Sequence, residues 1–472
     1  MKIFLIRKNT ADSNALNLSK MADLFGLKLL DHPVDSSDFA IIVSQENLDA
    51  VSKLPPARAV LVYDCCQNSE KFKVVRAHGG LYRMGGVKYI TQQFSGLSIP
   101  SANATYALSG LENADTLIWL NDDPFFVVQK KEGCEWFFLA QKDAVDLDSP
   151  IHNKNFSFNK MFAQIIPFAM FFKYISKSRF NQYANLMIDD PSLLHRYGFI
   201  DYGQLVDVTR DNDFAVTIAF IPWNYKKSHR KTVDLFSANH NRLSICVHGC
   251  DHAASEFASM DDIMLNWKIS LARKRMEHHK RRFGLSYDNA IVFPHGAFSV
   301  ESMRVLRQHR FTAAVNSTIF ARNYYGGLKV RDFITPSTTY YGLPLFLRRS
   351  PKHIEDFAYD LFFGRPALIV QHSVDFAEGW DRVIAFVNQL KSMEPRLKWR
   401  PLGKIVEKMC PADQQIQAEI RGDGLTPHVD RRYSLKSWFE AALRRTMCEM
   451  RDRIVHRSKF LRGDRANWLG HT

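Results

Sequence analysis

Cysteine is scarce in this chain, which excludes a disulfide framework as the source of its stability. The 472 residues include seven cysteines, an odd number without regular spacing. Small disulfide-stapled domains need a dense and even set of cysteines, so reduced thiols are expected here. A chain of this length can bury a large core without cross-links. At roughly 100–200 residues per domain, it predicts two or three domains.

Long apolar runs and phosphate-binding glycine loops are also missing. The most apolar stretch, residues 161–175, follows Lys160 and contains Pro167 and Lys173. A transmembrane helix needs about 20 apolar residues, so this stretch predicts a buried or partly exposed helix instead. No Gly-x-Gly-x-x-Gly or Walker-type loop follows any expected strand, which argues against a nucleotide-binding domain of those kinds.

The first residues of the sequence predict a strand. A charge at Lys2 and only four apolar residues before Arg7 leave little room for the apolar core of a signal peptide. We therefore expect a cytoplasmic protein.

The net charge is +14, and basic residues are concentrated near the carboxyl end. Residues 434–465 carry nine Lys/Arg against four Asp/Glu, on a loose helical apolar pattern. The sequence predicts a basic helical tail over residues 411–472. A helix packed on the protein is the ordinary interpretation, and peripheral contact with an anionic membrane is the alternative. The core lacks a recognisable nucleic-acid module, so nucleic acid is not an expected partner.

Two further regions are expected before this tail, and both are α/β. Residues 1–145 predict a small flavodoxin- or Rossmann-like accessory domain, in which short apolar strands alternate with helices. Residues 125–129 and 136–140 flank Lys130-Lys-Glu-Gly133 and predict a β-hairpin. Residues 155–410 repeat the β–α unit and predict a distorted (β/α) barrel, with an open doubly wound sheet as the alternative. The strands expected in this region are residues 185–188, 214–220, 243–247, 290–293, 312–315 and 367–370, with helices at 262–283 and 381–393.

The first chemical signal is a pair of carboxylates at a strand end, Asp189 and Asp190. Neighbours on a strand point to opposite faces, but at the strand end the backbone turns and both can reach one pocket. Two adjacent carboxylates repel each other and favour a cation beside them. Taken alone, Asp-Asp-Pro is also a common turn sequence.

The second signal is His248-x3-His252, which follows another expected strand. Two imidazoles can bind one divalent metal, and with one aspartate they would complete three ligands and leave a position open for water. Cys246 and Cys250 offer an alternative, a structural zinc knot. Four ligands interleaved within seven residues would crowd one ion, so we disfavour the knot.

Two more strand ends carry polar groups. His372 ends the strand at 367–370 and could transfer a proton near neutral pH. The loop Phe293-Pro294-His295-Gly296 follows a separate strand, and its N–H groups could line an oxyanion pocket. Each signal alone has an ordinary structural explanation, and the combination is what indicates an active site.

This order of motifs resembles the polysaccharide deacetylase family, whose core is the NodB homology domain. The resemblance covers residues 180–405. It implies that Asp189 is the general base, that Asp190, His248 and His252 bind a divalent metal, and that His372 is the general acid. The metal would be zinc, with cobalt or nickel as alternatives. The peptide N–H near His295, beside Pro294, would hold the oxyanion. Trp223, after the second expected strand, is a candidate for stacking on the sugar, with a core tryptophan as the alternative. The implied reaction is hydrolysis of an N-acetyl group on a sugar or glycan precursor.

The sequence departs from the family pattern at four places. Pro191 stands where a glycine often follows the Asp pair. Gly249 replaces a Ser/Thr, so a hydrogen bond that could shape the metal loop is expected to be missing. The arginine of the family's third motif is an apolar residue near Val292, so Asp189 is expected to lack its partner. The aspartate that orients the acid is not identifiable, and Asp332 and Asp375 are the candidates.

Two other functions are compatible with the sequence. An inactive carbohydrate-binding homologue would account for the missing arginine, and an amidase acting on a non-sugar acyl amide would use the same groups. Because the chain is expected to be cytoplasmic, we expect a substrate met at the inner membrane face during surface polysaccharide assembly.

Overall fold

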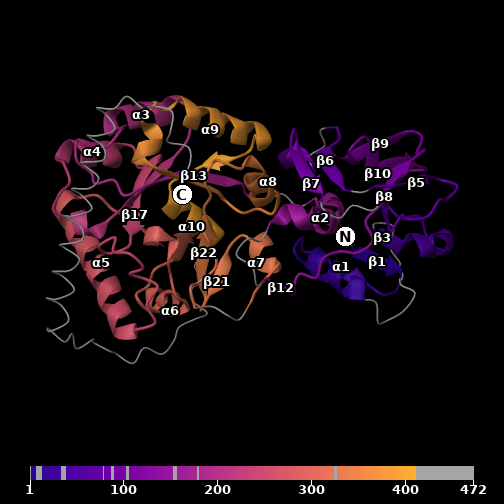
Figure 1. Cartoon of the computed structure of the whole chain (residues 1–472), viewed down its shortest axis with the longest axis horizontal. Helices are drawn as coiled ribbons and strands as arrows, with labels where there is room; N and C mark the ends of the chain where they lie inside the picture. Colours follow the sequence, from indigo (N-terminus) through magenta and orange to yellow (C-terminus); the bar gives the residue numbers. More distant parts are fainter. Residues whose placement is uncertain are drawn as a thin grey trace.

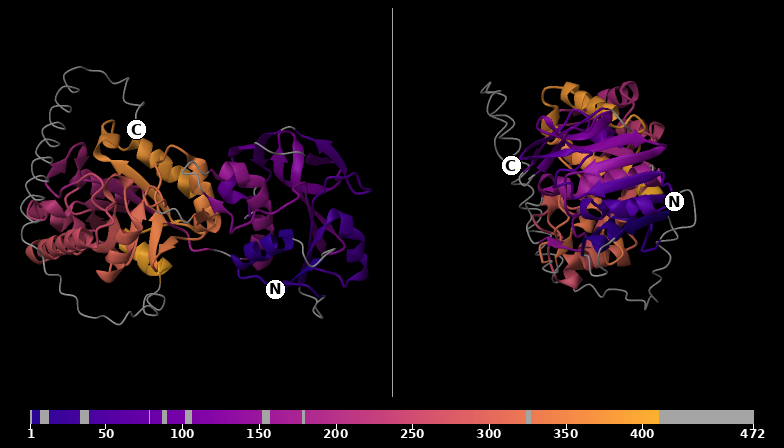
Figure 2. Two further views of the ribbon diagram at one scale, coloured as in Figure 1. Left: turned by 60° about the horizontal axis from the view of Figure 1, so that its bottom comes forward. Right: turned by 90° about the vertical axis from the view of Figure 1, so that its right-hand side faces the viewer.

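The computed structural model describes residues 2–6, 13–32, 39–77, 79–86, 90–101, 106–151, 157–177, 180–323 and 327–410. The basic helical tail expected at 411–472 lies outside these ranges. The described residues form two nine-stranded sheets with their helices, and three two-stranded sheets. The two large sheets lie side by side along the long axis of the molecule (Figures 1 and 2).

The first sheet is mixed, and its nine strands have the order β2-β1-β3-β4-β11-β10-β9-β6-β7. The first five are parallel and have the flavodoxin-like order 2-1-3-4-5, with β11 in the fifth place. The predicted hairpin is confirmed as β10 and β11, whose turn residues Glu132 and Gly133 have φ values of 52° and 79°. Its elements are β1 Lys2–Ile6, α1 Ser13–Asp23, β2 Leu29–Leu30, β3 Phe39–Ser44, β4 Ala59–Tyr63, β6 Gly80–Met84, β7 Ser98–Ser101, β9 Ala114–Leu120, β10 Asp123–Lys131 and β11 Cys134–Leu139, with β5 Lys73–Arg76 and β8 Tyr106–Ser109 paired separately.

Helix α2, Phe162–Ser176, is the apolar stretch expected to be a buried helix, and it is buried along most of its length. Its side chains pack on the first sheet and on α1, with Phe168 against Tyr63 and Phe172 close to Phe25. No helix in the described ranges is long and apolar enough to cross a membrane.

The second sheet is the predicted distorted (β/α) barrel. Parallel strands run in the order β22-β19-β18-β17-β16-β13-β23. A bridge between Arg349 and Ile369 joins the end of β22 to β23, so the sheet curls back on itself. The strands are β13 Tyr183–Asp189, β16 Val216–Phe220, β17 Leu243–His248, β18 Asp288–Val292, β19 Ala313–Asn316, β22 Leu343–Leu347 and β23 Ala367–His372, with the short β21 Thr338–Tyr340 and β24 Lys398–Trp399 at the margins. The helices are α3 Tyr202–Asp211, α4 Arg230–Ala238, α5 Asp262–Phe283, α6 Val300–Gln308, α7 Arg331–Ile334, α8 Ile354–Phe362, α9 Asp381–Met393 and α10 Leu402–Met409.

The interior of the barrel is a separate small core, because alternate residues of each strand point inward. Helix α10 fills the end of the barrel at which the strands begin, through Leu402, Ile405 and Val406. Asp288, at the start of β18, accepts a hydrogen bond from the N–H of Gly403 and so caps this helix. Helix α10 therefore closes one end of the barrel (the barrel plug), and the functional groups can lie only at the other end, where the strands finish.

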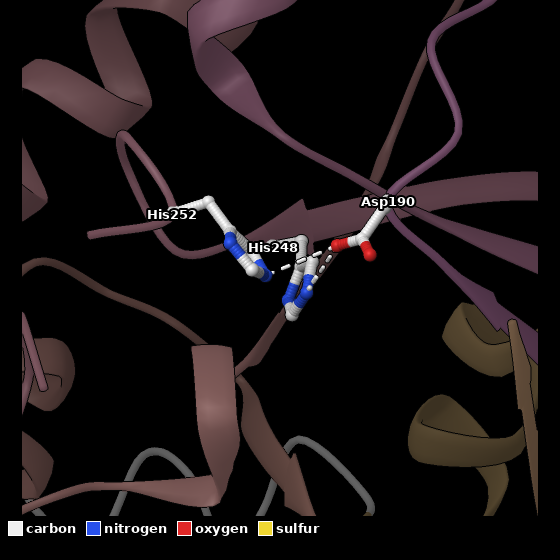
Figure 3. A group of neighbouring side chains, drawn as sticks. All are labelled: Asp190, His248 and His252. Atoms are coloured by element: carbon white, nitrogen blue, oxygen red, sulfur yellow. Dashed lines mark ion pairs between the residues drawn. The ribbon is translucent and has the colours of Figure 1, made fainter. Parts of the chain in front are cut away.

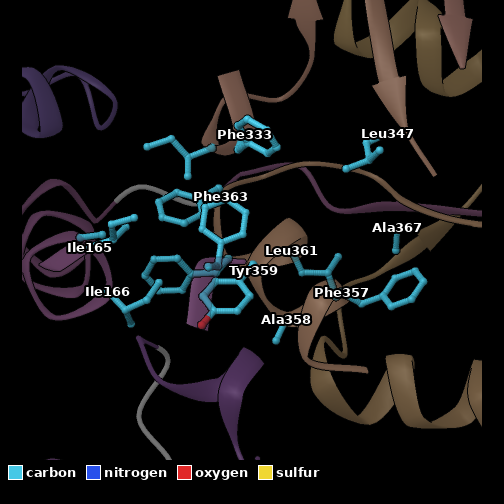
Figure 4. Close-up of a cluster of buried hydrophobic side chains, with 14 of the residues drawn as sticks. Ile165, Ile166, Phe333, Leu347, Phe357, Ala358, Tyr359, Leu361, Phe363 and Ala367 are labelled. Atoms are coloured by element: carbon cyan, nitrogen blue, oxygen red, sulfur yellow. The ribbon is translucent and has the colours of Figure 1, made fainter. Parts of the chain in front are cut away.

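Aromatic side chains join the two parts of the molecule. Tyr359 on α8 packs against Phe94 and Phe158, with ring centroids 5.1 and 4.9 Å apart. Figure 4 shows Tyr359 and its neighbours on α8 lying between α2, represented by Ile165 and Ile166, and the barrel strands. The junction is therefore a continuation of the hydrophobic core.

Candidate metal centre

The inward-facing positions of the barrel change from apolar to polar at the carboxyl ends of the strands. Along each strand, the residue two places after an interior apolar one faces the same way. Met187 is thus followed by Asp189, Cys246 by His248, and Phe346 by Arg348. On β23, His372 lies in register with Asp189 of β13. The strand alternation therefore places one polar layer on top of the apolar interior.

Asp190, His248 and His252 form the centre of this layer. The Nε2 atoms of His248 and His252 lie 3.2 and 3.1 Å from Oδ1 of Asp190. Figure 3 shows the two rings and the carboxylate directed toward one another. Asp190 has a φ of 78° and His252 a φ of 59°. Both values lie in the left-handed region. At Asp190 this conformation lets the side chain turn inward beside Asp189 instead of pointing to the opposite face.

The arrangement fits a divalent metal ion. Oδ1 of Asp190 is buried and has no hydrogen-bond partner among the described residues, although two imidazole nitrogens flank it. The ligating atoms of the three residues all lie within 4.8 Å of one another. Nδ1 of His248 lies 3.2 Å from the carbonyl oxygen of Val292 and can donate to it, which leaves Nε2 free for an ion. Two imidazoles and one carboxylate are the ligand set of a catalytic site with an open position.

The electrostatics of Asp190 also favour a bound cation. Burial alone would raise the pKa of Asp190, but the two imidazoles beside it lower that pKa well below its ordinary value. The Asp190 carboxylate is therefore ionised and able to act as a ligand. At the neighbouring His295, burial and the charge of His252 lower the pKa, and the two ring centroids lie 4.8 Å apart.

Asp189 does have an arginine partner, contrary to the expectation from the sequence. Arg348, at the end of β22, donates from Nη1 to Oδ1 at 2.5 Å and from Nη2 to Oδ2 at 2.6 Å. Both side chains are buried, with 4% and 5% of their surfaces exposed. Burial would raise the pKa of Asp189, but the Arg348 guanidinium and His248 lower it. The arginine is missing from the loop at residues 293–296 after β18 (the β18 loop), where the family pattern places it. Arg348, after β22, supplies the partner of Asp189 instead.

His372 lies beside this pair with its Nε2 atom 3.9 Å from Oδ2 of Asp189, and 56% of its side chain is exposed. Of the two aspartates considered as its partner, Asp375 accepts the main-chain N–H of His372 at 2.7 Å. The carboxylate of Asp332 accepts the N–H of Lys329 instead. Asp375 is therefore in a position to hold the strand end that carries His372.

The β18 loop borders the metal cluster. Pro294 packs over Gly249, where an added Cβ would come within 2.4 Å of its Cγ. His295 is exposed and has a φ of 55°. Asn316 donates to the carbonyl oxygens of Gly296 and Thr318 at 2.9 and 3.0 Å, which ties this loop to the next strand.

Trp223, the expected sugar-stacking residue, follows β16 and is half-buried. The guanidinium of Arg275 lies over the Trp223 ring, 5.0 Å from its centroid. The main-chain N–H of Trp223 donates to the carbonyl oxygen of Cys250. The ring is therefore next to the loop that joins His248 to His252 (the metal loop), and Arg275 occupies one of its faces.

The geometry gives no support to the zinc knot of Cys246 and Cys250. Cys246 belongs to the interior core, and Cys250 is fully buried beside Arg275. Burial raises the pKa of each thiol well above the ordinary value for cysteine. A raised pKa opposes formation of the thiolate, which is the form that binds a metal. Within the described ranges, Asp190, His248 and His252 are the one cluster of suitable ligands.

Sequence reasoning missed two contributors to this site. Arg348 directly follows β22, a strand that was not predicted because Pro344 interrupts its short apolar run. Glu256 accepts the N–H groups of Cys250 and Asp251 and shapes the metal loop in place of the missing Ser/Thr. Glu256 gave no signal, because a single glutamate in a polar loop resembles any surface residue.

No family model and no curated protein sequence matches this chain. Among solved structures, Agd3, described as a novel carbohydrate deacetylase, aligns over 88% of this chain and 88% of its own, with a TM-score of 0.55 and 11% identity. A family 4 carbohydrate esterase from Streptomyces lividans aligns over 47% of this chain and 93% of its own, with a TM-score of 0.28 and 12% identity. A family 4 pseudoenzyme from Bacillus anthracis aligns over 48% and 66%, with a TM-score of 0.30 and 9% identity. The likeness to Agd3 extends over both sheets, and the chain therefore has the fold of a carbohydrate deacetylase.

Proposed function

We propose that this protein is a metal-dependent hydrolase that removes an N-acetyl group from a sugar or glycan precursor. The observation that carries the proposal is the Asp190, His248 and His252 cluster beside the Arg348–Asp189 pair. A ligand set with an open position, next to an ionised carboxylate and a histidine, contains the groups that amide hydrolysis needs.

Asp190, His248 and His252 would hold the ion, and the two imidazoles with one carboxylate suit zinc, with cobalt or nickel as alternatives. When bound, such an ion polarises the acyl oxygen and lowers the pKa of a water molecule at the open position.

The residues around the ion divide the proton transfers between them. Asp189 accepts a proton from the attacking water, and Arg348 keeps its carboxylate oriented toward that water. Each carboxylate oxygen can accept more than one hydrogen bond, so the pairing with Arg348 leaves room for this step. The water oxygen forms a bond to the acyl carbon, and the C–N bond breaks. His372 donates a proton to the departing nitrogen, which yields acetate and an amine.

The β18 loop and Trp223 would contact the substrate. The N–H groups of Gly296 and Ala297 donate to Phe293 and Pro294 within the turn. We therefore assign the oxyanion donor to the N–H of His295, with Pro294 holding the turn. Arg275 lies over one face of the Trp223 ring, so a sugar ring would stack on the opposite face.

We further propose that the substrate belongs to surface polysaccharide biosynthesis and that the enzyme works in the cytoplasm, with its basic tail at the inner membrane face. The charge of residues 434–465 motivates this location. Deletion of residues 430–472 should weaken binding to anionic vesicles, and unchanged binding would refute the location.

The test of the function begins with metal content and ends with products. Wild type should hold about one divalent ion per chain, and the His248→Ala/His252→Ala variant should hold none. Acetate release should then be compared between N-acetylated sugar oligomers and simple acetamides. Release from acetamides alone would favour the amidase. Metal binding without release from either would favour an inactive carbohydrate-binding homologue, a reading that the retained Asp189–Arg348 pair argues against.

A further inference from the structure

Four ionisable side chains are buried behind the loop that joins His248 to His252. They are Asp251, Glu256, Lys268 and Arg275, with 5%, 1%, 8% and 10% of their side chains exposed. Two carboxylates face two cations, so the charges of the group balance. Buried charges are costly unless they are paired and hydrogen-bonded, and this group lies next to a metal loop.

Glu256 holds the loop from one side. Its Oε1 atom accepts the N–H of Cys250 at 2.8 Å, and its Oε2 atom accepts the N–H of Asp251 at 3.2 Å. These two N–H groups immediately precede His252, and both lie in the buried part of the loop. Gly249 makes the approach of Glu256 possible, because an added Cβ would lie 2.1 Å from Oε1.

Helix α5 holds the loop from the other side. Lys268 and Arg275 lie on the buried face of this helix, and each reaches the carboxylate of Asp251 at 2.5 Å. Nζ of Lys268 also lies 3.7 Å from Oε2 of Glu256. Arg275 donates to the carbonyl oxygen of Cys250 as well, at 3.2 Å. The peptide groups between the two histidines are therefore fixed by both α5 and Glu256.

We infer that Glu256 is a positioning residue for the metal centre, which holds His252 in its ligating orientation through the main chain of Cys250 and Asp251. His252 adopts a left-handed backbone conformation that a residue with a Cβ rarely keeps without support. The hydrogen bonds from Glu256 supply that support at the two preceding residues. The inference rests on the proposed function, since it concerns the affinity for the proposed ion.

The isosteric variant Glu256→Gln tests the inference. A carboxylate can accept both N–H groups, one on each oxygen, whereas a carboxamide has one acceptor oxygen and would direct an NH₂ group at the second N–H. The affinity for Zn²⁺, measured by competition with a chromophoric chelator, should fall about 10- to 100-fold. The visible absorption of the Co²⁺-loaded protein should change as well, because it reports the ligand geometry.

Glu394→Gln is the matched control. Glu394 is also fully buried, and it pairs with Gln93 and Arg396 away from the metal loop. It should show the Zn²⁺ affinity and Co²⁺ spectrum of the wild type. Equal affinities in wild type and Glu256→Gln would overturn the inference, and so would equal losses in the two variants. Wild type that binds neither ion would overturn the proposed function itself, which is a distinguishable result. If Glu256→Gln does not fold by circular dichroism, Glu256→Asp replaces it, because its carboxylate is one methylene too short to reach both N–H groups, and an unchanged affinity in that variant would overturn the inference.

Discussion

Arg348, just after strand β22, and Asp189, at the end of β13, meet in a two-point contact, and β23 is the one strand between β22 and β13 where the sheet curls back on itself. The planar guanidinium matches both carboxylate oxygens at once, which fixes the rotation of Asp189 as well as its charge. The pair is buried, so solvent does not weaken it as it would at the surface.

Replacing Arg348 by Lys should separate charge from orientation. Lys keeps a positive charge but offers a flexible point contact, so Asp189 should lose its fixed orientation. We expect kcat on an N-acetylated sugar to fall on the order of 100-fold, the loss that a misplacement of about 1 Å produces. Metal content should stay at the wild-type level, because Arg348 is not a ligand. Wild-type kcat in Arg348→Lys would show that the two-point contact has no part in catalysis.

Replacing Arg348 by Met should reveal the cost of an unpaired buried carboxylate. Asp189 would lose its cation while remaining out of water, and breaking a buried pair from one side costs about 3–5 kcal/mol. Urea unfolding at neutral pH measures this loss in the free energy of unfolding. Arg210→Met, at an exposed ion pair with Asp207 and Asp211, is the control and should change it little.

Restoring the family's serine at position 249 should damage the site. Gly249 has a φ of 61°, and an added Cβ would meet Glu256 and Pro294 at 2.1 and 2.4 Å. Gly249→Ser should therefore lower the free energy of unfolding by about 1–3 kcal/mol and reduce bound metal. Gly110→Ser is the matched control, because Gly110 has a φ of 73° with nothing within 4 Å of an added Cβ. If both variants retain wild-type metal content, the close approach of Glu256 does not control the loop.

Stability should fall on mild acidification because of His279. Burial lowers the pKa of His279 from 6.5 to about 4, so the folded protein holds it neutral between Phe220 and Phe283. The unfolded chain takes up a proton near pH 6.5, and the stabilisation is therefore complete above that pH and is lost as pH falls toward 4. The loss is roughly 1.4 kcal/mol per pH unit in this window.

Unfolding free energies of wild type and His279→Gln at pH 7, 6 and 5 measure this contribution. The wild type should lose more stability over the series than the variant. His240→Gln, at an exposed position, should follow the wild type. Parallel curves for wild type and His279→Gln would show that His279 is not held neutral by the fold.

The barrel plug should be a large contributor to stability. Ile405 is fully buried inside the barrel, so Ile405→Ala should lower the free energy of unfolding by about 2–5 kcal/mol. Lys404→Ala, on the exposed side of α10, should have a small effect in the same denaturation experiment.

The sequence predicted the strands that carry the metal cluster, because each is an apolar run ending in a polar motif. Helix α5 was also predicted with its observed bounds, from its capping Asp261 to Gly284. The sequence did not indicate that Lys268 and Arg275 of this helix are buried against a carboxylate of the loop between His248 and His252. Such pairs depend on tertiary contacts that no local pattern encodes.

Arg348 illustrates a second limit. Its strand is short and contains Pro344, and the adjacent Arg349 makes the segment resemble an exposed loop. The inward direction of Arg348 follows only once Phe346 is known to face the barrel interior. Likewise, the left-handed conformation of Asp190 decides whether both carboxylates share one pocket, and it is set by the surrounding fold.

The position of α10 has a consequence for synthesis of the chain. Leu402, Ile405 and Val406 complete an interior whose other walls come from strands made earlier, beginning with β13. A nascent chain that ends before residue 402 would expose this apolar interior to water, even with Asp190, His248 and His252 already present. The last strand of the first sheet, β11, ends at Leu139, so that sheet can fold while the chain is still growing. The barrel cannot, because its first strand, β13, pairs in register with β23, the last of its seven parallel strands. The polar layer of Asp189, Asp190, His248, His252 and His372 is therefore complete only after β23 has been made, and the interior beneath it is closed only when α10, which ends at Met409, has left the ribosome.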